Sequence, residues 1–217
     1  MGLIVRDQGV CAYATALALQ EELVSGKIAG ATDDVLLLLE HEPVYTLGRG
    51  ADAQDVLDAD RVLGVPLFRV SRGGGVTFHG PGQFVAYPIL TLVRGRRDVH
   101  GYVRSLENVV IGVCADFDIA AGRRPATTGV WVGEKKIASI GVGIRRWTTF
   151  HGVALNVTTD LRYFSHIVPC RMPDVRMTSM AAELGSAPAM AAVRASFVAR
   201  FRSEFDYATT QPAACYA

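Results

Sequence analysis

Apolar runs of strand length recur along this chain, and three longer stretches have helical periodicity. Strands are predicted at 33–43, 82–93 and 148–157, and a hairpin at 129–144. Within 66–75, another strand is predicted to run into a glycine-rich turn. Helices are predicted at 10–26, 98–117 and about 189–205, with Asp98 as the N-cap of the second. Because helices and strands do not alternate regularly, the order favours an α+β fold, a mixed β-sheet packed with helices.

Composition limits the classes of function. The 217 residues, 50% hydrophobic and 20% charged, suit one soluble domain over 1–217. A net charge of +1 gives no basic excess for nucleic acid. The longest apolar run, Val35 to Leu39, is too short to cross a membrane, and "MGLIVRDQG" lacks the apolar stretch of a signal peptide. We therefore predict a cytoplasmic protein that binds neither nucleic acid nor membrane.

The four cysteines differ in their surroundings. None lies close to another in sequence, so zinc-finger spacing is absent, and a reducing cytosol disfavours disulfides. Cys114 is predicted to be core, Cys11 to open a helix and Cys215 to lie in a short tail. Cys170 follows a proline in "SHIVPC", between a histidine and an arginine. From these residues alone it can be an apolar filler, a metal ligand, half of a disulfide or a nucleophile.

The segment "SRGGGVTFHGPGQ", from Ser71 to Gln83, has an unusual composition. Glycines let a backbone approach a ligand closely and expose its N–H groups. Arg72 could hold a carbonyl or anionic group there, and His79 could form a hydrogen bond. A tight surface turn is the alternative. The segment lacks the Gly-Lys-Ser/Thr ending of a nucleotide P-loop.

Two further strands carry small residues. "GEKKIASIGVGI" places Lys136 at the start of a strand, and "FHGVALNV" adds Gly152, Ala154 and the polar Asn156. Small side chains leave room for a ligand against a sheet. An ammonium beside a thiol stabilises the thiolate, although Lys136 can equally be a turn charge. The scattered histidines show no metal-binding spacing, so no metal or other cofactor is predicted.

Taken together, "RGGGVTFHGPGQ", "KKIASIG", "FHGVALNV" and "IVPC" resemble the octanoyltransferases of lipoate biosynthesis, the lipoyl(octanoyl) transferase family. "LLLLEHEPVYTLGR" and "MTSMAAELG" support the resemblance, which runs from about residue 5 to 205. It implies a fold shared with the catalytic domains of biotin and lipoate protein ligases.

The resemblance also implies an activity. The enzyme would move an octanoyl group from octanoyl-acyl carrier protein to a specific lysine of lipoyl-domain proteins, through a cysteine thioester. The acceptors would include E2 subunits of 2-oxoacid dehydrogenases and the glycine cleavage H protein. A monomer is expected. Chain-length preference and the preferred acceptor are not readable from the sequence.

Positions in this sequence match the family's motifs. Cys170 corresponds to the nucleophile and Lys136 to the lysine that activates it. Tyr13, His41 and Tyr87 also occur in family-like contexts. Arg171 stands where the family usually has glycine, which puts in question any use of that residue's N–H as an oxyanion donor. The residues expected to line the acyl site are Arg72, Gly73, Gly74, Gly75, Val76, Thr77, Phe78, His79, Ser139, Ile140, Gly141, Gly152, Val153 and Ala154.

Three alternatives remain open from the sequence. An ATP-dependent lipoate or biotin protein ligase would share the fold and would not need Cys170. An amidotransferase would take octanoate from an already octanoylated protein. A non-catalytic acyl-binding module would bind acyl chains without turnover.

Overall fold

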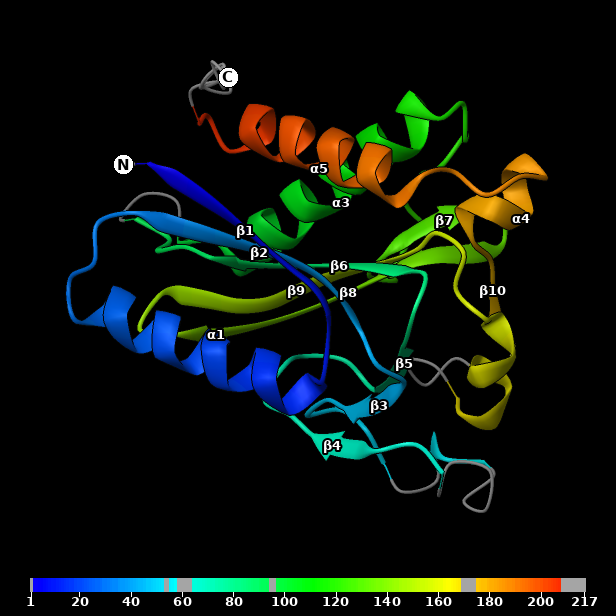
Figure 1. Ribbon diagram of the computed structural model, residues 1–217, viewed down its shortest axis with the longest axis horizontal. Helices are drawn as coiled ribbons and strands as arrows, with labels where there is room; N and C mark the ends of the chain where they lie inside the picture. Colours follow the sequence, from blue (N-terminus) through cyan, green and yellow to red (C-terminus); the bar gives the residue numbers. More distant parts are fainter. Residues whose placement is uncertain (1, 53–54, 58–63, 94–96, 169–174, 208–217) are drawn as a thin grey trace, which may run out of the picture.

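The computed structural model describes residues 2–52, 55–57, 64–93, 97–168 and 175–207 (Figure 1). Its large sheet runs in the order β1-β2-β6-β9-β8-β10, and β7 also pairs with β8. β1 pairs with β2 and β10 with β8 in parallel, whereas the other pairs are antiparallel, so the predicted mixed sheet is confirmed. The strands are β1 (Leu3–Cys11), β2 (Asp34–His41), β6 (Gln83–Ile89), β7 (Val130–Val132), β8 (Lys135–Arg145), β9 (Thr148–Asn156) and β10 (Arg176–Met177).

Helices cover both faces of this sheet. α1 (Tyr13–Ile28) lies on one face, and α3 (Val99–Asp116) and α5 (Met190–Glu204) lie on the other, as Figure 1 shows. A second sheet, in the order β4-β3-β5, sits at one end of the α1 face. It consists of β3 (Val44–Leu47), β4 (Leu67–Arg69) and β5 (Val76–His79), next to the 3-10 helix η2 (Leu161–His166) and, farther along the chain, α4 (Met180–Leu184).

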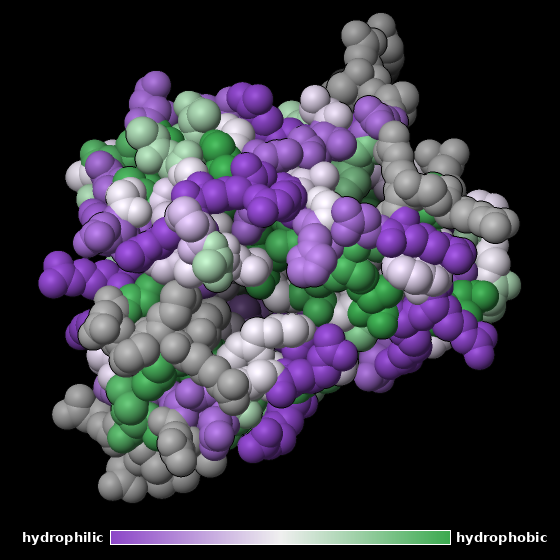
Figure 2. Space-filling model, turned by 180° about the vertical axis from the view of Figure 1, so that it is seen from behind, coloured by the Kyte–Doolittle hydropathy of each residue, from purple (hydrophilic) through white to green (hydrophobic). Residues whose placement is uncertain are grey.

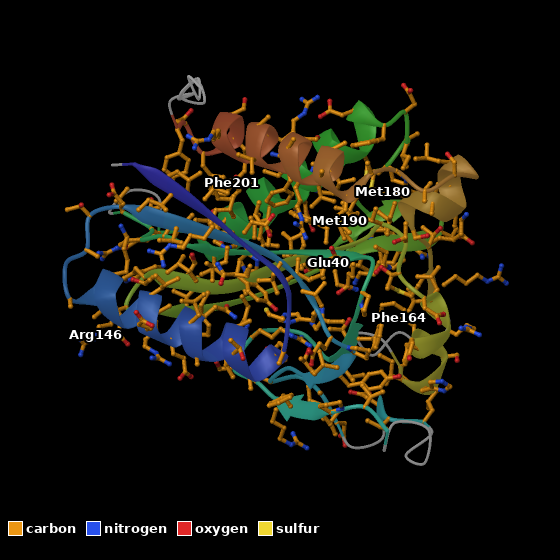
Figure 3. All side chains as sticks on the ribbon, viewed as in Figure 1. Glu40, Arg146, Phe164, Met180, Met190 and Phe201 are labelled. Atoms are coloured by element: carbon orange, nitrogen blue, oxygen red, sulfur yellow. The ribbon has the colours of Figure 1, made fainter. Side chains whose placement is uncertain are left out.

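The core is divided by the sheet. In β2, Leu36 and Leu38 pack into the cluster beneath α3 and α5, whereas Leu37 and Leu39 pack beneath α1. Successive side chains of a strand point to opposite faces, so a strand covered on both faces needs an unbroken apolar run. Figure 3 shows Phe201 of α5 above the large sheet and Phe164 of η2 beside the small sheet. Phe164 belongs to a third cluster with Tyr45 and Phe78.

The structure corrects three predictions. Cys11 does not open a helix; it ends β1, a strand that was not predicted. The predicted glycine-rich turn is only partly a turn, because 76–79 form β5 and pair with β3. The helix predicted at 10–26 begins at Tyr13 and ends at Ile28. The core position of Cys114 is confirmed, and so is the N-cap of α3, where Asp98 accepts a hydrogen bond from the His100 N–H.

The described part of the surface is mixed in polarity. Figure 2 shows apolar and polar side chains intermingled on the rear face, with a hollow near its middle. No helix in the described ranges has the length and apolar character needed to cross a membrane.

Truncating Phe197 tests the packing of α5 on the sheet. Its ring is fully buried and lies 4.8 Å, centroid to centroid, from that of Phe84 in β6. Phe197→Ala should lower the free energy of unfolding by about 3–5 kcal/mol, because it leaves a cavity between helix and sheet. Urea unfolding followed by circular dichroism measures the loss. The control Val198→Ala, at a half-buried neighbour, should cost clearly less; equal losses would contradict this packing.

Candidate active site

A cavity lies where the large sheet meets the glycine-rich segment and α1. β8 and β9 form its floor with residues whose side chains are small. Ser139 pairs with Ala154, and Gly141 pairs with Gly152, so the short side chains occur side by side. The residues that line the cavity are Tyr13, Arg72, Gly73, Gly74, Thr77, His79, Tyr87, Ser139, Ile140, Gly141, His151, Gly152, Val153 and Ala154.

Most of the residues predicted to line an acyl site are in that set, but Gly75, Val76 and Phe78 are not. β5 explains the difference, because its side chains alternate between two faces. Thr77 and His79 face the cavity, whereas Val76 and Phe78 pack into the hydrophobic cluster with Tyr45. The carbonyl oxygen of Gly75 accepts a hydrogen bond from Arg72.

Arg72 holds the glycine-rich segment in place. Its Nη1 donates to the carbonyl oxygens of Gly73 and Gly75, each at 3.0 Å. Its Nη2 donates to the carbonyl and hydroxyl oxygens of Thr46 in β3, each at 2.7 Å. The Gly73 N–H in turn donates to the Val142 carbonyl of β8 at 2.9 Å. The guanidinium therefore fastens the loop to the small sheet, and the Gly73 N–H fastens it to the large one. The predicted contact of Arg72 with a substrate carbonyl or anion stays a prediction.

Aromatic and imidazole rings form the opposite wall. The Nε2 atom of His41 lies 2.7 Å from the Tyr87 hydroxyl, and the His41 ring centroid lies 5.0 Å from that of Tyr13. Tyr13, His41 and Tyr87 were only weakly indicated by the sequence. His151 was not predicted as a lining residue, and its φ of 55° explains why. Strand alternation does not apply to a left-handed residue, so periodicity could not place its ring.

Burial keeps His79 and His151 of this wall neutral, and also His41, which contacts Tyr13 and Tyr87 of the wall. Desolvation lowers the pKa of His41 to about 4 and that of His151 to about 3, with Arg72 lowering the latter further. Burial also lowers the pKa of His79 well below its usual value. The wall is therefore polar but uncharged at neutral pH, apart from the Arg72 guanidinium.

A chain of hydrogen bonds connects His79 to the first residues of β8. Its Nδ1 lies 2.7 Å from Gln83 Oε1, an acceptor, so Nδ1 carries the proton. Gln83 Nε2 donates to Asn156 Oδ1, and Asn156 Nδ2 donates to the Thr178 carbonyl, both at 2.9 Å. The Thr178 N–H donates to the carbonyl oxygen of Lys136. This chain of amides links the cavity wall to the strand that carries the predicted lysine.

Lys136 is buried, although a lysine in a turn would be exposed. Only 1% of its surface is accessible, and Nζ lies 5.4 Å from the centroid of the Trp131 ring. Its neighbour Lys135 is exposed and pairs with Glu183 at 2.5 Å. Met177 of β10 pairs with Lys136 in the sheet register. The predicted nucleophile Cys170 and the neighbouring Arg171 lie outside the described residues.

No group of three or more His, Cys, Asp or Glu within the described ranges is placed to hold a metal ion.

Comparison with known proteins assigns the chain to a family. Residues 12–202 match the model of the lipoyl protein ligase A/B catalytic domain. A curated octanoyltransferase of Geobacter metallireducens is 48% identical over 199 residues, covering 92% of each chain. Another, from Solibacter usitatus, is 49% identical over 206 residues, covering 94% of this chain and 93% of the relative. The chain belongs to the octanoyltransferase family. Its activity is octanoyl transfer, which makes it an acyltransferase enzyme.

Solved structures show how the octanoyltransferase family relates to ligases in fold. A lipoate-protein ligase A bound with ATP aligns with a TM-score of 0.77 at 18% identity, covering 97% of this chain and 87% of the ligase. A biotin protein ligase from Aquifex aeolicus, in complex with biotin and ATP, aligns at 0.54 with 12% identity, covering 94% and 70%. At such low identities the alignments establish a shared fold only, and the predicted ligase-like fold is confirmed.

The neutral histidines predict how stability depends on pH. Between about pH 6.5 and pH 4 the unfolded chain binds protons that the folded chain excludes, so the free energy of unfolding falls as pH decreases. Each such histidine contributes up to about 1.4 kcal/mol per pH unit in that window. His151→Asn removes one ring and keeps a residue that tolerates a positive φ. Urea unfolding between about pH 6.5 and 4.5 should show a shallower slope in this variant; an unchanged slope would rule out a buried neutral His151.

Proposed function

We propose that this octanoyltransferase works in two steps, with Cys170 as the carrier of the acyl group and Lys136 as its proton partner. The donor is octanoyl-acyl carrier protein, and the acceptor is a specific lysine of a lipoyl-domain protein. E2 subunits of 2-oxoacid dehydrogenases and the glycine cleavage H protein are the expected acceptors. The observation that carries the proposal is the burial of the Lys136 amine, on the same strand that lines the cavity.

The chain path supports a meeting of the two residues. Val168 is anchored by its N–H to the Asp55 carbonyl at 2.7 Å, and Met177 is paired with Lys136. Cys170 lies between these two anchors in sequence, seven positions before Met177. Seven residues span at most about 25 Å when fully extended, a reach that allows the Cys170 thiol to approach Lys136.

In the first step, the Cys170 thiolate attacks the thioester carbonyl of the donor. The carbon–sulfur bond to the carrier's pantetheine thiol breaks, and the departing thiolate takes a proton from the Lys136 ammonium. In the second step, the acceptor lysine amine attacks acyl-Cys170. An amide forms, Cys170 leaves as a thiolate, and Lys136 takes the amine's proton. Both residues end in their starting states, and no ATP is consumed.

The lining of the cavity is suited in character to an acyl chain. Gly141, Gly152 and Ala154 leave space against the sheet, and Ile140 and Val153 provide apolar surface beside them. The exposed backbone of Gly74 lies at the same cavity and can face a developing oxyanion. Arg72, by holding this loop, keeps its geometry fixed before the substrate arrives.

Mass spectrometry of the intact protein tests the proposal. Mixing the enzyme with octanoyl-acyl carrier protein, without ATP, should give a hydroxylamine-sensitive octanoyl adduct on Cys170. Cys170→Ser should give no such thioester, and Lys136→Ala should form it about 10²–10⁴-fold more slowly, the usual contribution of a proton-transfer group. The matched control Lys135→Ala should react like the parent, because that amine is at the surface.

Different outcomes would favour different mechanisms. A requirement for ATP would favour a ligase, which the fold of lipoate-protein ligase A makes the natural second candidate. Transfer only from an already octanoylated acceptor protein would favour an amidotransferase. Acyl binding without any turnover would contradict catalysis altogether.

A further inference from the structure

β8 contains an irregularity beside Lys136. Val130 of β7 pairs with Ala138, but the next residue, Trp131, pairs with Lys136, so Ile137 has no partner on β7. Such a bulge changes the face to which the following side chains point. Ile137 and Ala138 are both fully buried in the cluster under α3 and α5, although adjacent residues of a regular strand face opposite ways.

The bulge explains why Lys136 is on the cavity side. In an unbroken strand it would share a face with Ala138 and point toward α3 and α5. With the extra residue at Ile137, it shares a face with Ser139 and Gly141, which line the cavity. Trp131, its partner in register, lies with its ring against the lysine amine. Met177, which is also paired with Lys136, packs against the third hydrophobic cluster, on the side of the small sheet.

Gly129 leaves the space that the lysine side chain occupies. A Cβ atom built on Gly129 would lie 2.6 Å from Lys136 Cε and 3.2 Å from its Nζ, and also 2.6 Å from the Ala138 carbonyl oxygen. The φ of Gly129 is +121°, a conformation that side-chain-bearing residues rarely adopt. The end of the Lys136 side chain therefore lies directly against the Cα of Gly129.

Glu107 of α3 holds this glycine. Its Oε1 accepts a hydrogen bond from the Gly129 N–H at 3.0 Å, and only 3% of the residue is exposed. Its Oε2 accepts from Arg123 Nε at 2.6 Å. A buried carboxylate is costly unless it is hydrogen-bonded, and these two donors satisfy one oxygen each. The carboxylate thus ties the residue under Lys136 to a long, rigid helix.

We propose that Glu107 and Gly129 are positioning residues that fix where the Lys136 amine lies. The proposal rests on the proposed role of Lys136 as the proton partner of Cys170. Glu107 sets the backbone of Gly129, Gly129 gives room on one side of the lysine, and Trp131 limits it on another. Neither Glu107 nor Gly129 is required to touch the substrate, so they affect the chemical step and leave substrate binding unchanged.

The test compares the rate of Cys170 alkylation by iodoacetamide against pH, read by peptide mass spectrometry, with kcat and KM for the octanoyl donor. Gly129→Ala should move the alkylation profile to higher pH and lower kcat by at least about tenfold at unchanged KM, because small displacements of a reacting group are costly. Gly122→Ala is the matched control. Gly122 forms a backbone bridge to the same Trp131, but a Cβ there meets no atom within 4 Å. It should behave like the parent.

A second pair of variants changes Glu107 instead, and so does not place an alanine at the positive φ of Gly129. Glu107→Ala should shift the alkylation profile as Gly129→Ala does, because the Gly129 N–H loses its acceptor. Glu107→Gln should restore the parent profile, because its amide oxygen can still accept that hydrogen bond and Arg123, partly exposed, can move aside. Equal profiles of Glu107→Ala and the parent would overturn the proposal.

The double variant separates positioning from a general structural effect. If Gly129 acts through the lysine, adding Gly129→Ala to the Lys136→Ala enzyme should lower its kcat by no more than about twofold, because the lysine that Gly129 positions is already absent. If Gly129→Ala lowers kcat by the same factor in the parent enzyme and in Lys136→Ala, the positioning role is overturned. If Lys136→Ala itself leaves the alkylation profile unchanged, the proposed role of Lys136 fails. If Lys136→Ala shifts the alkylation profile but Gly129→Ala and Glu107→Ala leave it unchanged, only the positioning proposal is overturned.

Discussion

The pairing of β8 is the constraint on which the rest of the site depends. From Ala138 to Arg145 it pairs with β9, and at Lys135 and Lys136 it pairs with β7 and β10 on its two edges. The bulge at Ile137 separates these two parts. It lets one strand bury apolar side chains under α3 and α5 and still present a lysine to the opposite face. A regular strand would place that amine in the hydrophobic core, where an unpaired cation is very costly.

The cavity combines an apolar floor with a polar wall that stays uncharged. Backbone and hydroxyl oxygens surround the Arg72 guanidinium, so its charge is used to hold the glycine-rich segment. Burial keeps the nearby imidazoles neutral and able to form hydrogen bonds. An apolar chain that binds there would therefore not have to desolvate a charged side chain. The amide chain through Gln83 and Asn156 links this wall to the strand of Lys136, the residue that we propose transfers the proton.

Sequence periodicity predicted the elements that have one strong pattern. The unbroken run of β2 and the capped helix α3 are local properties, and both were found near their predicted bounds. β1 was missed because its exposed edge position gives no clean alternation. β5 was missed because its glycine-rich context resembles a turn, and only pairing with β3 makes it a strand. Phe78 was accordingly placed at the cavity, although it packs on the other face.

Prediction of the site likewise succeeded for local patterns and failed for features that depend on tertiary contacts. Short motifs indicated Ser139, Gly141, Gly152 and Ala154, since small residues on paired strands leave space by themselves. The left-handed backbone of His151 and the bulge beside Lys136 depend on tertiary contacts, and no local pattern encodes them. Glu107 lies in a helix with nothing in its sequence context to connect it with Gly129. Such long-range contacts become visible only in three dimensions.

Rapid-quench mass spectrometry tests most directly whether Cys170 carries the acyl group covalently during transfer. The experiment mixes enzyme with octanoyl-acyl carrier protein and a lipoyl-domain acceptor, then follows acyl-enzyme and octanoylated acceptor in the same samples. If Cys170 carries the acyl group, acyl-Cys170 should appear before product, and it should form and decay at least as fast as overall turnover. Product that accumulates ahead of the acyl-enzyme, or an adduct that decays more slowly than turnover, would contradict it.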